Sequence, residues 1–224
     1  MDKKMNKTEL KASARYRTVL KSLDNTWRLL DEGRVAVLKE VLMWLGHPDQ
    51  SLKIIHVAGT NGKGSTGTML GAILKANGYT YGHFSSPFIM DDREQIRING
   101  DMISKSDFLK YYDQVATLFK QHDVPPYYLS YFEYFTIISL LAFVDKKVDL
   151  VIFETGLGGL WDATNAIESP MLTVFTKISI DHQNLLGHNI SEIAENKAAI
   201  IKPGTWVIDY AGQDIEAKNI TSTY

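Results

Sequence analysis

The amino-acid sequence predicts an α/β fold in which a mostly parallel sheet carries helices on both faces. Three observations lead to this prediction. Short apolar runs alternate along the chain with longer segments of helical periodicity. Residues 148–154 are almost continuously apolar, which is typical of a strand buried on both faces. The apolar run 54–58 leads through a glycine-rich turn into a helix, as in phosphate-binding α/β domains.

The first half of the chain predicts two helices and three strands. A helix with one apolar face is indicated by Val35, Leu38, Val41, Leu42 and Leu45, and Gly46 and Pro48 end it. A strand at 53–58 precedes a helix that runs to about residue 76, where Asn77-Gly78 forms the C-cap. A second strand covers 80–84. The polar segment 91–100 contains a short strand and the turn Asn99-Gly100.

The second half continues the alternation of helices and strands. Helices fit 107–121 and 132–146, and strands fit 148–154, 171–176 and 206–209. Asn189 caps a helix that runs to about residue 201, with Glu192 in the position of a capping box. Pro203-Gly204 ends this helix. Residues 211–224 are mixed and polar, and we expect them to be an unfinished element or a tail.

The composition is that of an ordinary soluble protein, with 45% apolar and 22% charged residues. A net charge of −2 gives no strong electrostatic reason to expect a nucleic-acid or acidic-membrane partner. The absence of cysteine excludes disulfides, thiolate metal sites and a cysteine nucleophile, and it suits the cytoplasm. The polar N-terminus lacks the apolar core of a signal peptide, and the apolar stretch 137–144 is too short to span a bilayer.

The glycine-rich turn has the order of a phosphate-binding loop: buried strand, glycines, lysine, hydroxyl pair, helix. Its residues are Gly59, Thr60, Asn61, Gly62, Lys63, Gly64, Ser65 and Thr66. Glycines allow backbone N–H groups to face phosphate oxygens, and the helix N-terminus adds positive potential. Lys63 can reach the outer phosphates, and Ser65 or Thr66 can lie near magnesium. The spacing departs from G-x-x-x-x-G-K-[ST], but the context predicts nucleotide phosphate binding.

Polar side chains follow several of the predicted strands, where ligands of such sheets bind. Glu154 ends a buried strand, and a carboxylate there is the usual way to hold magnesium beside phosphates. The alternative interpretation is that Glu154 caps a helix or is solvated. Ser85-Ser86 follows another strand; its hydroxyls can cap a helix or bind magnesium. His182 is a poor ligand for a hard ion on general grounds, so magnesium binding is the less favoured interpretation there.

Three further features have two interpretations each. Lys197 is by base rates a solvated surface lysine, and its functional alternative is a lysine of depressed pKa. The glycine-rich segment 156–165 indicates a flexible binding loop, in which Trp161 either stacks on a flat ring or packs in the protein. The aromatic run 127–135 is expected to be mostly core, with one or two rings lining a heteroaromatic pocket.

Together these motifs resemble the folylpolyglutamate synthase / dihydrofolate synthase family of the Mur ligase superfamily. The resemblance is carried, in order, by the segments 57–65, 84–87, 96–100, 154–159, 162–165, 181–182 and 197–202. It implies a P-loop NTPase-like Mur ligase central domain and an ATP-dependent amide ligase. In this family ATP phosphorylates a carboxylate of a pteroate or folate, and the amine of L-glutamate then displaces phosphate. Aligning the reactants and neutralising the transferring charge are the main tasks of such a protein.

The resemblance also implies roles for particular residues. Gly62 to Ser65 match the ATP-phosphate loop. Ser86 and Glu154 match ligands of a first magnesium ion, and His182 matches a ligand of a second one. Lys197 matches a lysine that the family carries carbamylated, and a carbamate is an anionic oxygen ligand. These matches assign catalytic roles to Lys63, His182 and Lys197. Positions matching pterin contacts are Asp31, Glu32, Gly33, Arg34, Ser130, Tyr131, Phe132, Glu133, Trp161, Asp162 and Ala163.

The sequence departs from the family pattern in residues and in length. At several positions the usual residue of the family is replaced in this chain. Arginine is replaced by Leu160 and by Gln95, leucine by Trp161, histidine by Phe88 and glutamate by Asn196. Family members are longer and have a second, C-terminal domain that closes over the site. We therefore expect residues 1–224 to form an incomplete N-terminal ATP-binding domain that is weak or inactive alone. A monomer is expected for the family, and self-association is a possibility for the shorter chain.

Two other functions remain open at this point. One is a nucleotide-binding remnant without ligase activity, and the other is a Mur-type ligase with a different acceptor, such as a cell-wall precursor. The Lys63-Gly64-Ser65 order and the loop 162–165 favour a folate acceptor, because cell-wall ligases more often have threonine directly after the lysine. Dihydropteroate and reduced folate are not distinguished as acceptors.

Overall fold

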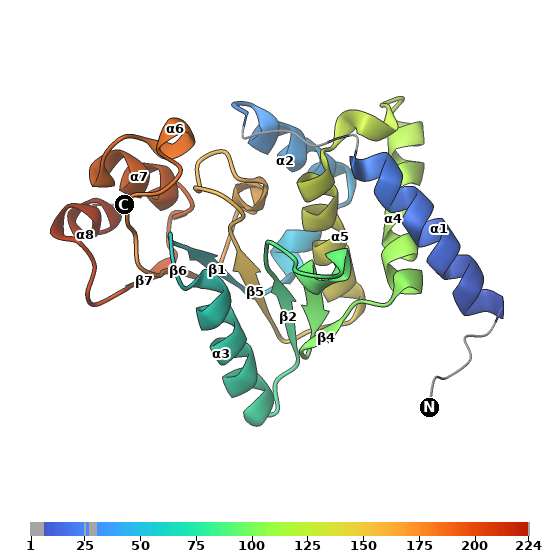
Figure 1. Cartoon of the computed structure of the whole chain (residues 1–224), viewed down its shortest axis with the longest axis horizontal. Coiled ribbons are helices and arrows are strands. Elements are labelled where there is room, and N and C mark those ends of the chain that lie inside the picture. Colours follow the sequence, from blue (N-terminus) through green and yellow to red (C-terminus); the bar gives the residue numbers. More distant parts are fainter. Residues whose placement is uncertain (1–6, 25, 27–30, 224) are drawn as a thin grey trace.

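The computed structural model describes residues 7–24, 26 and 31–223, and Figure 1 shows their arrangement. The α-helices are α1 (Lys7–Asp24), α2 (Arg34–Trp44), α3 (Lys63–Ala76), α4 (Lys105–Gln121), α5 (Tyr131–Asp145), α6 (Gln183–Leu186), α7 (Ile190–Ala198) and α8 (Ile215–Thr221). The strands are β1 (Ile54–Ala58), β2 (Tyr81–Phe84), β3 (Ile96–Ile98), β4 (Asp101–Met102), β5 (Leu150–Glu154), β6 (Leu172–Phe175) and β7 (Trp206–Asp209). Short 3-10 helices lie at η1 (Pro48–Ser51), η2 (Asp92–Gln95), η3 (Pro126–Tyr128) and η4 (Ala163–Ala166).

The strands form one sheet in the order β4-β3-β2-β5-β1-β6-β7. The pairs from β2 through β5, β1 and β6 to β7 are parallel. The pairs β2–β3 and β3–β4 are antiparallel and end the sheet on one side. The expected mostly parallel α/β sheet is therefore confirmed. β1, which precedes the phosphate-binding loop, lies between β5 and β6, so both neighbours end beside the loop.

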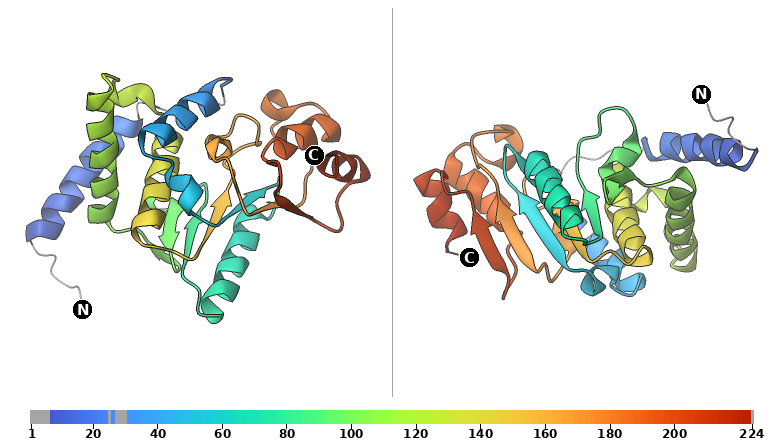
Figure 2. Two further views of the ribbon diagram at one scale, coloured as in Figure 1. Left: turned by 180° about the vertical axis from the view of Figure 1, so that it is seen from behind. Right: turned by 90° about the horizontal axis from the view of Figure 1, so that it is seen from below.

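Helices cover both faces of this sheet. On one face Val151 and Phe153 of β5 belong to the large core that includes α4 and α5, and on the other Ile152 packs with residues of α3. Near β6, Phe175 packs with α7 and α8, while Val174 belongs to the α3 side. Figure 2 shows α1, α4 and α5 stacked outward from one end of the sheet and α6, α7 and α8 gathered at the other.

Helix α3 lies unusually close to the sheet because two of its positions are glycine. A Cβ atom at Gly67 would lie 2.6 Å from the His83 ring, and one at Gly71 would lie 2.6 Å from the Tyr81 ring. Both distances are far below ordinary contact, so alanine at either position requires the ring or the helix to move. The close packing determines where the N-terminal turn of α3 stands above the strand ends.

Helices α1, α6 and α8 were not anticipated. The interior of α1 is mostly polar, but Tyr16, Val19 and Leu23 are spaced three and four residues apart and are buried. Segment 211–224 was expected to be an unfinished element or a tail, yet it contains α8, which begins at the cap Asp214 and buries Ala217. Within the described residues, no helix is both long and apolar enough to cross a membrane.

Candidate functional site

The glycine-rich loop is held by the segment that follows β6. The backbone N–H groups of Thr60 and Asn61 donate to the Lys177 carbonyl at 2.8 and 3.2 Å. The Thr60 hydroxyl donates to the Ser179 carbonyl at 2.9 Å and accepts from the Ser179 N–H at 3.1 Å. Gly59 has φ +145°, and a Cβ there would lie 1.9 Å from the Thr176 hydroxyl oxygen. Only glycine therefore fits at the start of this loop.

Two lysines from distant parts of the chain converge on one backbone oxygen of the loop. The Nζ atoms of Lys63 and Lys197 each donate to the Gly59 carbonyl at 3.1 Å. Lys197 is only 3% exposed. Burial lowers the pKa of Lys197 to about 8, and the positive charge of Lys63 lowers it further. The solvated-surface interpretation of Lys197 is therefore wrong. The negative charges that act on its amine are those of Asp162 and Asp181.

Glu154 stands at the carboxyl end of β5 with an unsatisfied oxygen. It is 4% exposed, and its Oε2 atom has no hydrogen-bond partner. The oxygen lies 3.6 Å from where a Cβ of Gly64 would stand, so it faces the phosphate-binding loop directly. Burial raises the pKa of this carboxyl group to about 7, and the charge of Lys63 partly opposes that rise. A buried, unpartnered carboxylate oxygen beside a phosphate loop is the donor that magnesium requires.

Lys197 is positioned by the glycine-rich segment that follows β5. A Cβ at Gly159 would lie 2.6 Å from the Asn196 carbonyl oxygen and 2.9 Å from the Lys197 Cα atom. The N–H of Leu160 donates to that same carbonyl at 2.8 Å. The glycines thus permit the loop backbone to pack directly on α7. This part of the loop packs against the helix that carries Lys197, and its role in binding stays a prediction.

Asp162 organises the same segment from inside the protein. Its side chain is 1% exposed and accepts hydrogen bonds from the N–H groups of Leu157 and Thr164 and from the Thr164 hydroxyl. The Thr164 hydroxyl lies 2.9 Å from the His56 Nε2 atom on β1. Because burial lowers the pKa of His56 to about 3, the imidazole is neutral. The two chain neighbours of Asp162 were also matched to pterin contacts. Of these, Trp161 is half-buried and Ala163 is buried.

The structure brings together two of the segments matched to pterin contacts. Arg34 donates through Nε and Nη2 to both oxygens of Glu133, at 2.8 and 2.6 Å, and through Nη2 to the Tyr128 carbonyl at 2.7 Å. Glu133 also accepts from the Ser130 N–H, which completes the capping box of α5. Residues 31–34 and 130–133 therefore adjoin. The Arg34–Glu133 pair is largely buried, so it fixes these two segments against each other.

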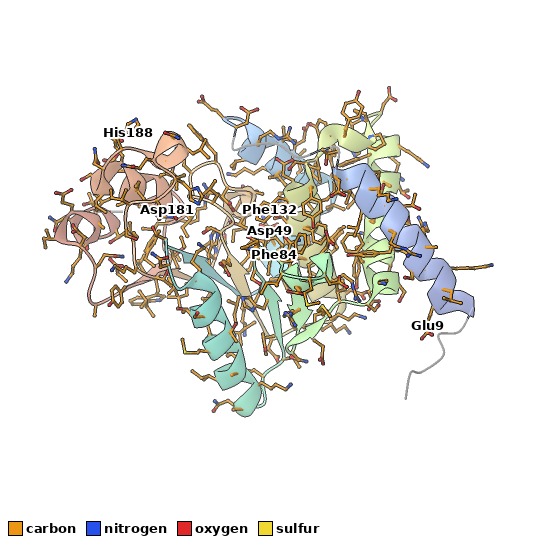
Figure 3. All side chains as sticks on the ribbon, in the orientation of Figure 1. Glu9, Asp49, Phe84, Phe132, Asp181 and His188 are labelled. Atoms are coloured by element: carbon orange, nitrogen blue, oxygen red, sulfur yellow. The ribbon has the colours of Figure 1, made fainter. Side chains whose placement is uncertain are left out.

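The aromatic run is mostly core, as expected. Tyr131, Tyr134 and Phe135 are at most 1% exposed, whereas Tyr127 is 64% exposed. Figure 3 places Phe84 and Phe132 close together in the middle of the molecule, and their ring centroids are 5.5 Å apart. The Tyr131 hydroxyl donates to Asp92 and accepts from Gln95, so these polar groups anchor the segment after Ser86-Pro87.

The other predicted magnesium ligands follow two further strands of the same sheet. Ser86 lies in the loop after β2, the strand beside β5. His182 follows β6, is half exposed, and its Nε2 lies 3.7 Å from the Asp181 carboxylate, which Figure 3 places toward α6 and α7. No group of three or more His, Cys, Asp or Glu side chains in the described part of the chain is arranged to hold a metal.

Sequence reasoning missed the groups that hold the site in place. Thr176, the Lys177 carbonyl and Ser179 support the loop, and the His56–Thr164 contact supports Asp162. The sequence shows His56 within the apolar run of β1, but its partner Thr164 lies 108 residues away along the chain. Backbone carbonyls leave no signal in a sequence, so the loop's support could not have been found there.

Comparison with known proteins agrees with this geometry. The Mur ligase middle domain family matches residues 57–209. The dihydrofolate synthase/folylpolyglutamate synthase of Bacillus subtilis is 44% identical over 173 residues, covering 76% of this chain and 40% of that protein. The folylpolyglutamate synthase of Lacticaseibacillus casei is 37% identical over 183 residues, covering 81% of this chain and 42% of that protein.

Solved structures show the same similarity. The Mycobacterium tuberculosis folylpolyglutamate synthase complexed with ADP has a TM-score of 0.83 and 32% identity, covering 95% of this chain and 48% of that one. The apo form of the L. casei enzyme has a TM-score of 0.85 and 33% identity, covering 93% and 51%. The chain thus spans less than half the length of these two curated relatives and about half of the solved chains. The chain belongs to the folylpolyglutamate synthase / dihydrofolate synthase family of the Mur ligase superfamily.

Proposed function

We propose that these 224 residues are the ATP-binding part of an ATP-dependent ligase that joins L-glutamate to the carboxylate of a pteroate or folate. The observation that carries this proposal is the convergence of Lys63 and Lys197 on the Gly59 carbonyl, beside the unpartnered oxygen of Glu154. Cationic groups, open backbone N–H groups and a buried carboxylate are what a magnesium-bound triphosphate needs. Relatives of the chain have been solved with ADP and with AMPPCP and folate.

Different residues of this chain have different proposed roles in such a reaction. The loop 59–66 binds the phosphates and Lys63 neutralises the transferring phosphoryl group. The acceptor carboxylate receives this phosphoryl group and becomes an acyl phosphate. The amine of L-glutamate then attacks the acyl carbon, and phosphate leaves. Magnesium, when bound, spreads the charge of the outer phosphates. Glu154 is the protein ligand best placed for it, and we propose Ser86 and His182 as further ligands.

Lys197 has the properties that carbamylation requires. Its neutral amine, favoured by burial, adds to the carbon of CO2 and loses one proton, which leaves an anionic carbamate. A carbamate at this position exchanges a buried cation for an oxygen ligand next to Lys63. The proposal therefore explains why a lysine is buried beside a second lysine.

The acceptor is proposed to lie over the base formed by Arg34 and Glu133, with Trp161 at its edge. The two segments adjoin in the structure, which supports a shared surface. Arg34 and Glu133 satisfy each other, so we assign them a positioning role beneath the acceptor. The cysteine-free sequence is consistent with action in the cytoplasm.

Turnover by the purified chain tests this function. The assay contains magnesium, ATP, bicarbonate, L-glutamate and either dihydropteroate or a reduced folate, and mass spectrometry follows the glutamylated product. We expect slow, glutamate-dependent product that disappears in Lys63→Ala. ATP binding without product from either acceptor would show that this chain alone binds nucleotide and has no ligase activity. Product with a different acceptor carboxylate, and none with either pteridine, would identify another Mur-type ligase.

A further inference from the structure

His83 on β2 is a buried histidine that the proposed reaction does not use. Its side chain is 5% exposed, and within the part of the chain that the structure describes its Nε2 atom has no hydrogen-bond partner. Burial lowers the pKa of His83 to about 4, and the charge of Arg97 also lowers it, so the ring is neutral near pH 7. Hydrogen bonding through Nε2 therefore does not hold this ring in place; its packing does.

The ring packs against the first turns of α3. His83 and Ile152 are register partners on β2 and β5, so both side chains point to the face of the sheet that α3 covers. A Cβ atom at Gly67 would lie 2.6 Å from Nε2 and 2.9 Å from Cε1 of His83, and 3.3 Å from Cγ2 of Ile152. Two side chains of the sheet thus fill the space beneath residue 67. A residue with a side chain there would not leave α3 at its observed distance from the sheet.

The same distance sets the spacing of the phosphate-binding site. Gly64 precedes Gly67 by about one turn of α3, and Glu154 follows Ile152 by two residues on β5. The Oε2 atom of Glu154 is 3.6 Å from where a Cβ of Gly64 would stand. The contact of His83 with Gly67 and the approach of Gly64 to Glu154 therefore join one helix to neighbouring positions of one sheet. Because the helix is rigid over a single turn, moving it at Gly67 also moves Gly64 relative to Glu154.

We infer that His83 is a positioning residue of the phosphate-binding site: its ring limits how closely α3 approaches the sheet and thereby sets the distance between loop 59–66 and Glu154. This inference rests on the proposed nucleotide-binding function. Ordinary contact between side-chain atoms begins at about 3.5 Å, so a methyl group on residue 67 requires about 1 Å of movement. Binding sites tolerate displacements of about 0.5 Å, so movement of this size should weaken the binding of a magnesium-bound triphosphate.

Tyr81 provides a matched contact farther from the loop. A Cβ atom at Gly71 would lie 2.6 Å from Cε2 of Tyr81, the same separation that a Cβ at Gly67 has from His83. Gly71 lies one further helical turn from Lys63, so the same steric conflict there acts mainly on the far end of α3. Gly71→Ala therefore separates damage to the packing of the helix from displacement of the loop.

The test measures Mg–ATP affinity by titration calorimetry and stability without ligand by thermal unfolding. The proteins are the wild type, Gly67→Ala, the double variant Gly67→Ala/His83→Ala, His83→Phe and the control Gly71→Ala. In the double variant the new methyl group enters the space that the ring leaves, so α3 returns to its place. His83→Phe keeps Gly67 and places a larger ring beneath it. Far-UV circular dichroism shows which variants are folded.

We expect Gly67→Ala and His83→Phe each to weaken Mg–ATP binding about tenfold or more. The double variant should recover to within about threefold of the wild type. Gly71→Ala should lower the melting temperature about as much as Gly67→Ala does, yet weaken Mg–ATP binding less than about threefold.

Three results would overturn the inference. They are wild-type affinity in His83→Phe, a double variant that binds as weakly as Gly67→Ala, and a loss of affinity in Gly71→Ala equal to that in Gly67→Ala. Where Gly67→Ala does not fold, His83→Phe and the affinity of the double variant relative to the wild type decide the question. Failure of the wild type to bind Mg–ATP would instead overturn the proposed function itself.

Discussion

Replacing Glu154 with glutamine should stabilise the protein at alkaline pH, although it removes a residue of the candidate site. The carboxyl group is buried and one oxygen has no partner, so its pKa rises from 4.5 to about 7. A shift of that size corresponds to about 3 kcal/mol of unfolding free energy, at about 1.4 kcal/mol for each unit of pKa. The wild type has this stability when Glu154 is protonated and loses it when Glu154 ionises.

The sign of the pH dependence follows from the raised pKa. The contribution of Glu154 to stability is fully present below pH 4.5, falls as the pH rises through about 7, and is gone above it. Urea unfolding at pH 5 and at pH 8.5, without magnesium or nucleotide, measures the effect. The difference between Glu154→Gln and the wild type should increase by about 2.5 kcal/mol between these two pH values.

Asp49→Asn is the matched control. Asp49 is 3% exposed, has one oxygen without a partner, and its pKa is also raised by burial, but it lies in η1, outside the phosphate-binding loop. Relative to the wild type, both variants should therefore become more stable as the pH rises. Only Glu154→Gln should lose the increase in melting temperature that Mg–ATP gives the wild type. A Glu154→Gln protein with the same pH slope as the wild type would refute the reasoning about burial.

Three further predictions concern residues around the site. Glu133→Gln should lower the unfolding free energy by about 3 kcal/mol in urea titrations, because it leaves the half-buried Arg34 guanidinium without its charge partner; an effect below about 1 kcal/mol would contradict this. Gly59→Ala should abolish Mg–ATP binding in calorimetry, since its Cβ would meet the Thr176 hydroxyl at 1.9 Å; wild-type affinity would show that the loop tolerates a side chain. With 13C-bicarbonate, wild-type NMR spectra should show a carbamate signal that is stronger at pH 8.5 than at pH 6.5, because the pKa of Lys197 is about 8. Its persistence in Lys197→Gln would assign the signal to another amine.

The strands, the loop and the helix that carry the site could be predicted from patterns of neighbouring residues in the sequence. The strand at β7 was expected at its observed bounds, and the strand, glycines and lysine around Gly62 gave the loop and α3. These features depend on residues that are neighbours in sequence, so periodicity and turn chemistry reveal them. The parallel arrangement then followed from the alternation of strands and helices.

The arrangement within the site depends on contacts between distant residues, which local pattern does not contain. Lys197 was expected to be solvated, but the fold places it on a carbonyl 138 residues away in the chain. Segment 156–165 is rich in glycine because α7 packs against its backbone, and sequence alone does not distinguish close packing from flexibility. Helix α1 did leave a periodic signal in Tyr16, Val19 and Leu23, which its high polar content obscured.

The central claim is that loop 59–66 binds the phosphates of ATP with the help of Lys63. Calorimetric titration of Mg–ATP into the wild type and into Lys63→Ala tests it most directly. The account predicts saturable binding by the wild type and at least about tenfold weaker binding by a Lys63→Ala protein that keeps its circular dichroism spectrum. Equal affinity in the two proteins, or no binding by a folded wild type, would contradict it.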